Sequence, residues 1–151
     1  MMNVRVLCVG RLKESFYEEA CREYEKRLKG LCRLEIVELK EESGEKKLEK
    51  EAEAILAAIP RGSFTVALAI EGRLLSSEKL AVLLSEKALR GESRITFLIG
   101  SSDGLSERVK NACDERISMS PMTFPHHLAR VMLLEQIYRA FSIASGGKYH
   151  K

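Results

Sequence analysis

The histidines of this 151-residue chain all lie near its end, at His126, His127 and His150. An imidazole titrates near neutral pH, so it can accept a proton, bind a metal or serve as a buried polar group. A metal site needs further ligands, but adjacent histidines diverge on a helix and no cluster of carboxylates or cysteines accompanies them. We therefore expect no metal here.

The last residues, GGKYHK, combine an aromatic ring, a titratable ring and a cation after two hinge-like glycines. These side-chain types can stack on a flipped nucleotide base and contact phosphate. The alternative is a disordered tail, because most chain ends fray. We take Tyr149, His150 and Lys151 as functional candidates.

The run ISMSPMTFPHH, residues 117 to 127, predicts a rigid loop between a short strand and a long helix. Pro121 and Pro125 each remove a backbone donor and fix a φ angle. Rigid loops on a scaffold often bind ligands. By itself, however, the run is better explained as a helix entry in which Met122 and Phe124 are core residues.

The elements that position these residues alternate between strand and helix. Apolar runs predict strands, and stripes at helical spacing predict the helices between them. Such alternation requires crossover connections, so we predict an α/β fold with a mostly parallel sheet and helices on both faces. The predicted strands are Val4 to Val9, Leu34 to Leu39, Phe64 to Ile70, Ile95 to Ile99 and Arg116 to Ser120.

Open parallel sheets bind ligands beyond the carboxyl ends of their strands. Three loops follow the last three predicted strands: Leu68 to Gly72, Gly100 to Gly104 and Met119 to Phe124. The Gly100 loop reads GSSDG, which is neither a dinucleotide-binding fingerprint nor a P-loop with its lysine. Alone, it predicts a strand-to-helix turn whose glycines supply positive φ angles.

The last predicted helix, about His126 to Ser145, is apolar on more than one face. A single sheet cannot cover such a helix, so a second subunit or a position buried within one domain is required. For a short chain we favour a homodimer. Arg130 and Arg139 are interpreted as cations on the helix surface.

Length and composition predict one domain over residues 1 to 151. The net charge of +3 indicates only a mild preference for acidic partners. The four cysteines show no CxxC spacing, which fits a reducing cytoplasm. No apolar run approaches the length of a membrane span, so we expect a soluble cytoplasmic protein without a membrane partner.

Three segments, MSPMTFPHH, EQIYRAFSIASGGKYHK and FLIGSSDGLS, resemble the small SPOUT-class (α/β-knot) methyltransferases that methylate N3 of a pseudouridine in large-subunit ribosomal RNA. The resemblance runs from the first strand to the last residue. It implies a C-terminal trefoil knot, S-adenosyl-L-methionine as cofactor, and a homodimer in which the tail helps build the active site across the interface.

Residue by residue, the resemblance implies a cofactor pocket formed by Leu68, Gly100, Met119, Ser120, Pro121, Met122, Thr123 and Phe124. It implies catalytic or RNA-contacting roles for Arg139, Tyr149, His150, His126 and Lys151. The sequence departs from the family pattern at Ser101, where glycine is usual, and at Lys148, where proline is common.

The implied substrate is the helix 69 loop of 23S ribosomal RNA in assembled ribosomes. Three other interpretations stay open: a non-catalytic RNA-binding dimer of the same fold, a SPOUT methyltransferase for another RNA position, and a nucleotide-dependent enzyme using the Gly100 loop. The acceptor of the proton from the base is open too, since His150 or water could take it.

Overall fold

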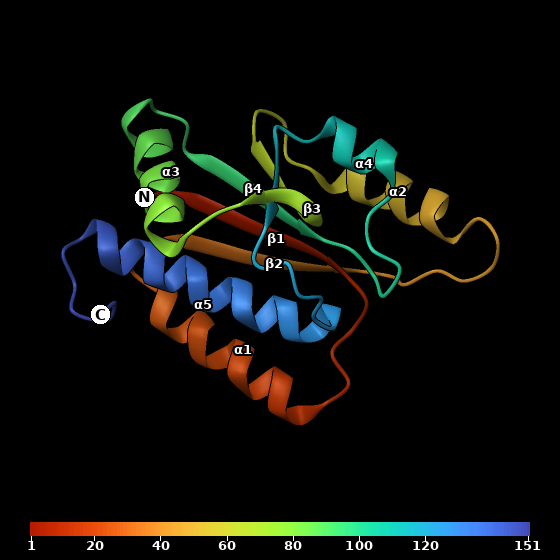
Figure 1. Ribbon diagram of the computed structural model, residues 1–151, viewed down its shortest axis with the longest axis horizontal. Coiled ribbons are helices and arrows are strands. Elements are labelled where there is room, and N and C mark those ends of the chain that lie inside the picture. The colour runs from red at the N-terminus through yellow and green to blue at the C-terminus, as the bar shows by residue number, and fades with distance from the viewer.

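The computed structural model describes all residues from Met1 to Lys151. Strands and helices alternate along the chain (Figure 1), and most begin and end within a few residues of the predicted bounds. The strands are β1 (Asn3–Val9), β2 (Arg33–Leu39), β3 (Phe64–Leu74), β4 (Arg94–Ile99) and β5 (Glu115–Ser118). The helices are α1 (Ser15–Leu28), α2 (Lys47–Ala58), α3 (Ser77–Leu89), α4 (Glu107–Ala112) and α5 (His126–Ala144).

The five strands form one parallel sheet in the order β2-β1-β4-β3-β5. Central strands of such a sheet are covered on both faces, which requires continuous apolar runs. β4 meets this requirement, because every residue from Ile95 to Ile99 is buried. The predicted α/β class with a mostly parallel sheet is confirmed.

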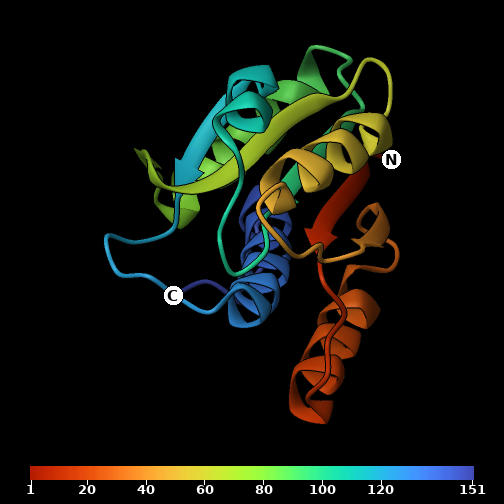
Figure 2. The same ribbon diagram turned by 90° about the vertical axis from the view of Figure 1, so that its right-hand side faces the viewer.

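Helices cover the two faces unequally. Helices α1, α3 and α5 pack on one face, and α2 and α4 on the other (Figures 1 and 2). The larger core cluster includes Cys21 of α1, Leu84 of α3 and Leu133 of α5. The smaller one joins Ile55 of α2 and Val109 of α4 to the opposite side of the sheet.

Helix α5 lies between α1 and α3, which together with the sheet cover most of its surface. Leu133, Leu134 and Ile137 are fully buried, and no residue from His126 to Ile143 is exposed. Packing within one chain therefore explains most of the apolar circumference that suggested a second subunit. The homodimer stays a prediction, as does the knot, which is a property of chain threading.

Strand β3 runs past its predicted end at Ile70 and changes register against β5. Ile117 is paired both with Leu68 and with Arg73, so the intervening residues leave the ladder. At Gly72 the two backbones come so close that an added Cβ would lie 2.8 Å from the Ile117 nitrogen. A side chain at this position would push β5 away from β3.

Arg130 of α5 is not the surface cation that the sequence suggested. It is only 2% exposed. Its guanidinium donates to Glu38 Oε2 at 2.6 Å and to the Gly10 carbonyl at 2.9 Å. These bonds fasten the beginning of α5 to the ends of β1 and β2.

Replacing Arg130 with methionine should therefore destabilise the fold by roughly 1 to 3 kcal/mol, because the buried Gly10 carbonyl and the partly exposed Glu38 carboxylate both lose a charged donor. Urea denaturation measures this change. The matched control is Arg22→Met on the exposed face of α1, where the side chain is 66% exposed; it should change stability by about 0.5 kcal/mol or less. Equal effects of the two substitutions would contradict the structural role of Arg130.

Candidate functional site

The Gly100 to Gly104 and Met119 to Phe124 loops meet at the carboxyl ends of β4 and β5 and, with Leu68 to Glu71, line a pocket of about 680 Å³. This volume lies within the usual range for small-molecule sites. All but one of the candidate cofactor-binding residues line it: Leu68, Gly100, Met119, Ser120, Met122, Thr123 and Phe124. Pro121 is exposed and does not line the pocket, so its contribution is to shape the loop. Leu68 to Gly72 was predicted as a loop after a strand, but these residues lie within β3, where its pairing with β5 is interrupted.

Met119 to Phe124 is held by short-range hydrogen bonds. Ser118 Oγ donates to the Ser120 carbonyl at 2.9 Å, and Ser120 Oγ accepts from the Met122 nitrogen at 3.0 Å. These turns end β5 at Ser118, two residues before the predicted end. Met122 remains 73% exposed, so it is not the core residue of the helix-entry interpretation.

Gly100 is needed for a reason that the sequence did not suggest. The sequence predicted that the glycines of this loop supply positive φ angles, but Gly104 does so and Gly100 does not. In the structure, an added Cβ would lie 2.5 Å from the Gly104 oxygen and 2.8 Å from the Leu105 nitrogen. Gly100 therefore allows the loop to close on itself, with Gly104 at a φ angle of +78° and its nitrogen bonded to the Ser101 carbonyl at 2.8 Å.

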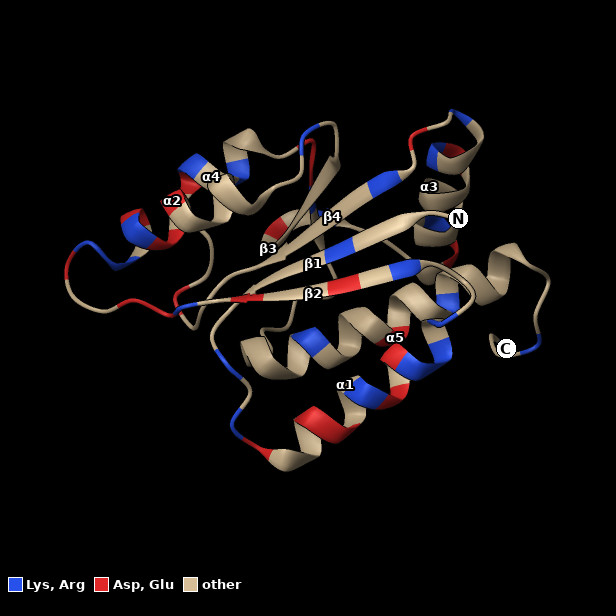
Figure 3. Cartoon of the chain, turned by 180° about the vertical axis from the view of Figure 1, so that it is seen from behind, with Lys and Arg blue, Asp and Glu red and all other residues tan.

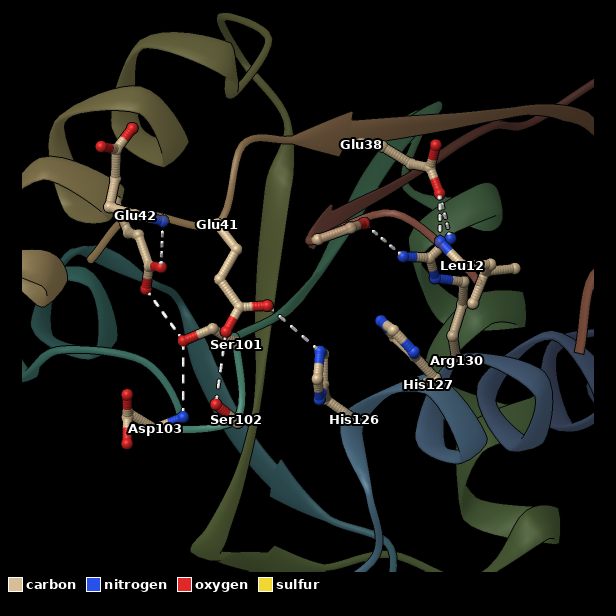
Figure 4. Close-up of polar contacts among 12 residues, drawn as sticks. Leu12, Glu38, Glu41, Glu42, Ser101, Ser102, Asp103, His126, His127 and Arg130 are labelled. Carbon is tan, nitrogen blue, oxygen red and sulfur yellow. Dashed lines mark hydrogen bonds and ion pairs between the residues drawn. The ribbon is translucent and has the colours of Figure 1, made fainter. Parts of the chain in front are cut away.

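Ser101, the departure from the family pattern, is accommodated by a buried partner. The serine is 3% exposed, and its hydroxyl donates to Glu51 Oε1 of α2 at 2.9 Å (Figure 4). Sequence reasoning missed Glu51. The available signal was a carboxylate at the edge of the α2 stripe, beside Ala52 and Ile55, which are both buried.

A second set of polar contacts lies nearer the solvent. Glu41 Oε2 accepts from Lys47 Nζ at 2.9 Å and from Ser102 Oγ at 3.3 Å, and Lys47 also bonds Asp103 at 2.7 Å. The hydrogen bond from Lys47 lowers the pKa of Glu41, which therefore stays ionised. Segment 40 to 46 is thus tied to the Gly100 loop.

His126 begins α5 and lines the pocket, as predicted from its position. Its ring lies 4.1 Å from that of His127, and its Nε2 is buried without a hydrogen-bond partner. Burial, and then the neighbouring His127, lower the pKa of His126 below its ordinary value. A neutral imidazole at the pocket wall can accept a proton.

The other catalytic candidates gather around the opposite end of α5. Tyr149 donates to Glu135 Oε2 at 2.7 Å, and this bond raises the pKa of Tyr149 to about 12. Arg139 lies 3.0 Å from His150 Nδ1 and stacks over the Tyr149 ring at 4.7 Å. Lys151 is exposed at the chain end. The tail is therefore folded onto its own helix.

Within one chain the catalytic candidates thus form two groups. Arg139 lies roughly 20 Å along the helix axis from His126, at about 1.5 Å per residue. A second pocket, of about 400 Å³, lies between them. It shares Ile117, Ser118 and Met119 with the first pocket, and its Glu135 is the partner of Tyr149.

Charge distribution does not mark an RNA surface. Positive and negative side chains are interspersed on α1 and on the segment between β2 and α2 (Figure 3). No three His, Cys, Asp or Glu side chains are placed together to hold a metal ion. None of the helices is both long and apolar enough for a membrane crossing.

Comparison with known proteins gives a consistent result. The model of a family described as predicted SPOUT methyltransferase matches residues 2–150. Proteins called ribosomal RNA large subunit methyltransferase H from Clostridioides difficile (strain 630) and Clostridium novyi (strain NT) are each 45% identical over 159 residues. Each alignment covers 99% of this chain and 100% of the relative.

Solved structures support the fold alone. A probable methylase family protein from Haemophilus influenzae Rd KW20 has a TM-score of 0.59 at 16% identity, covering 99% of this chain and 71% of that one. A probable methyltransferase from Bordetella pertussis Tohama I has a TM-score of 0.58 at 12% identity, covering 93% and 96%. Because the family model and its relatives match this chain from end to end, the chain belongs to the SPOUT methyltransferase family, together with the ribosomal RNA large subunit methyltransferases H.

Proposed function

We propose that this protein methylates large-subunit ribosomal RNA with S-adenosyl-L-methionine, at N3 of a pseudouridine in the helix 69 loop of 23S RNA. The observation that carries this proposal is the pocket at the strand ends, lined by the Gly100 and Met119 to Phe124 loops, which carry two of the three family motifs. The full-length relatives at 45% identity bear the name of a large-subunit RNA methyltransferase. Activity on ribosomal RNA in turn implies that the protein is located in the bacterial cytoplasm.

The residues present fit this cofactor. Met119, Met122 and Phe124 offer apolar surface for an adenine ring, while main-chain groups at the ends of β4 and β5 can read its edge. Ser101 is tied back to Glu51, so it does not obstruct the pocket. That contact removes the main support for a non-catalytic relative that has lost its cofactor.

The bound cofactor supplies an electrophilic methyl group on a sulfonium. The protein must align the ring nitrogen with that methyl group, which can remove several kcal/mol from the barrier. It must also allow the nitrogen to lose its proton. The residues that would hold the base are Arg139, Tyr149 and His150, whose cation and rings suit phosphate contact and stacking.

His150 orients the base in this proposal and does not accept its proton. Arg139 Nη1 donates to His150 Nδ1 at 3.0 Å, so Nε2 carries the hydrogen and donates to Glu78 Oε1 at 2.8 Å. Both ring nitrogens are therefore occupied. His126, whose Nε2 has no hydrogen-bond partner, and water remain as acceptors.

A homodimer would bring the two groups of residues together. If α5 lies antiparallel to its copy, the tail of one chain comes near the pocket of the other. The partly exposed side chains Leu128 and Met132 lie on α5 between the two groups. The partner chain would then supply Arg139, Tyr149 and His150.

The proposed function is tested by incubating the protein with labelled S-adenosyl-L-methionine and ribosomes that carry unmethylated pseudouridine in helix 69. We expect label at N3 of that pseudouridine, located by mass spectrometry of RNA fragments. Free 23S RNA, assayed in parallel, tests whether the assembled ribosome is the substrate. Label at a different RNA position would replace the proposed target, and absence of any transfer would contradict the activity.

The role of His150 is tested by a pH profile of methyl transfer. His150→Ala should lower the rate by a factor that is the same at every pH, because the ring only orients the base. Rate loss that diminishes as pH rises would instead identify His150 as the proton acceptor. Arg22→Ala on the exposed face of α1 is the control, since its side chain belongs to neither group of catalytic candidates.

The dimer is tested by placing charge on the partly exposed side of α5. Leu128→Glu combined with Met132→Glu should produce monomers, because an uncompensated charge in an interface costs several kcal/mol. Light scattering at micromolar concentration gives the mass. Val82→Glu on α3, where the side chain is 54% exposed, should leave the mass unchanged. A monomeric wild-type protein would rule out the dimer.

A further inference from the structure

Glu51 of α2 is a buried carboxylate without a cationic partner. It is 2% exposed, and none of the ion pairs in the structure includes it. It accepts two hydrogen bonds, from Ser101 Oγ at 2.9 Å and from the Glu42 nitrogen at 3.0 Å. Burial of a carboxylate is unfavourable, so an apolar residue at this position would suit stability better.

The two bonds of Glu51 reach two different segments, at Ser101 and at Glu42, which are both labelled in Figure 4. Ser101 lines the pocket directly. The Glu42 nitrogen belongs to the segment between β2 and α2, and its neighbour Glu41 contacts two further residues that line the pocket. Glu41 accepts from Ser102 Oγ at 3.3 Å and lies 3.7 Å from His126 Nε2.

We propose that Glu51 is a positioning residue, which sets the Gly100 to Gly104 loop and segment 40 to 46 against each other before the cofactor binds. This inference rests on the proposed function of the pocket. A loop already in its binding conformation does not have to be ordered when the ligand binds, and affinity rises accordingly. Glu51 touches neither the cofactor nor the target base and acts through Ser101 and Glu42.

The solvent-side ion pairs of Lys47 also connect the Gly100 to Gly104 loop with segment 40 to 46, but more weakly. Its partners Glu41 and Asp103 have side chains 34% and 60% exposed, so water and salt screen these ion pairs. The Glu51 bonds lie in the interior, where hydrogen bonds are stronger and an unmade one is costly. Glu51 therefore determines the loop position more than Lys47 does.

The hydrogen bonds that a side chain at position 51 can accept decide which variants test the proposal. The Ser101 hydroxyl and the Glu42 nitrogen both donate to Glu51. Methionine at position 51 has a similar size but no oxygen that accepts either bond, so Glu51→Met loses both. Glu51→Gln is the conservative variant, because its amide oxygen can accept from the Glu42 nitrogen while its amide nitrogen donates to the Ser101 hydroxyl, which can also accept.

Titration calorimetry tests the proposal with S-adenosyl-L-methionine and with S-adenosylhomocysteine, which lacks the sulfonium charge. Glu51→Gln, which can keep both bonds, should bind both ligands within about twofold of wild type, whereas Glu51→Met should weaken both about tenfold. KM for the methyl donor should rise by the same factor, with kcat within about twofold of wild type. Glu53→Gln, on the exposed side of α2, is the matched control and should bind normally.

Ser101→Ala breaks the bond to Glu51 from the other end and keeps the test decisive if Glu51→Met fails to fold. Ser101→Ala combined with Glu51→Met should weaken binding less than the product of the two single effects, because both substitutions break the contact between Ser101 and Glu51. Weakening of S-adenosyl-L-methionine alone would indicate direct charge attraction and overturn the positioning role. Normal affinity in both single variants would overturn the inference while leaving the proposed function intact. Wild-type protein that binds neither ligand would contradict both.

Discussion

All five strands run in one direction, and this constraint determines where the protein can bind a ligand. Parallel strands place the loops after their carboxyl ends along a single edge of the sheet. The order β4-β3-β5 then places the loops after β4 and β5 beside the interrupted part of β3, although helices α3 and α4 separate these segments along the chain. The close approach of β5 to β3 at Gly72 completes the arrangement, because it brings Met119 to Phe124 over the same pocket.

Buried polar contacts hold this edge from both faces of the sheet. On one face, Glu51 of α2 anchors the Gly100 loop through Ser101. On the other, Arg130 of α5 bonds Glu38 and the Gly10 carbonyl, which fixes the start of α5 and with it His126. The buried Glu51 and Arg130 side chains lose their hydration on folding. Their hydrogen bonds compensate for this loss only when the segments around the pocket are correctly placed.

The long helix α5 separates the proposed cofactor pocket from the residues proposed to hold the RNA base. His126 at its beginning belongs to the pocket, whereas Arg139 and the folded tail lie at the other end. Neither group is complete by itself for methyl transfer to a base. The proposed dimer would combine them, and it would also cover the partly exposed apolar residues that α1 and α3 leave on α5.

The sequence by itself determined the order of strands and helices, the parallel sheet and the Gly100 and Met119 to Phe124 loops of the pocket, because apolar periodicity and turn residues act over short distances. It did not determine the roles of individual polar residues. Arg130 looked like a surface cation until its partner 92 residues away was seen, and Glu51 was overlooked because its partner is 50 residues away. The need for glycine at positions 72 and 100 likewise depends on backbones that meet only in the folded chain. Whether a charge is buried and what it bonds are set by long-range packing, and only the tertiary structure decides them.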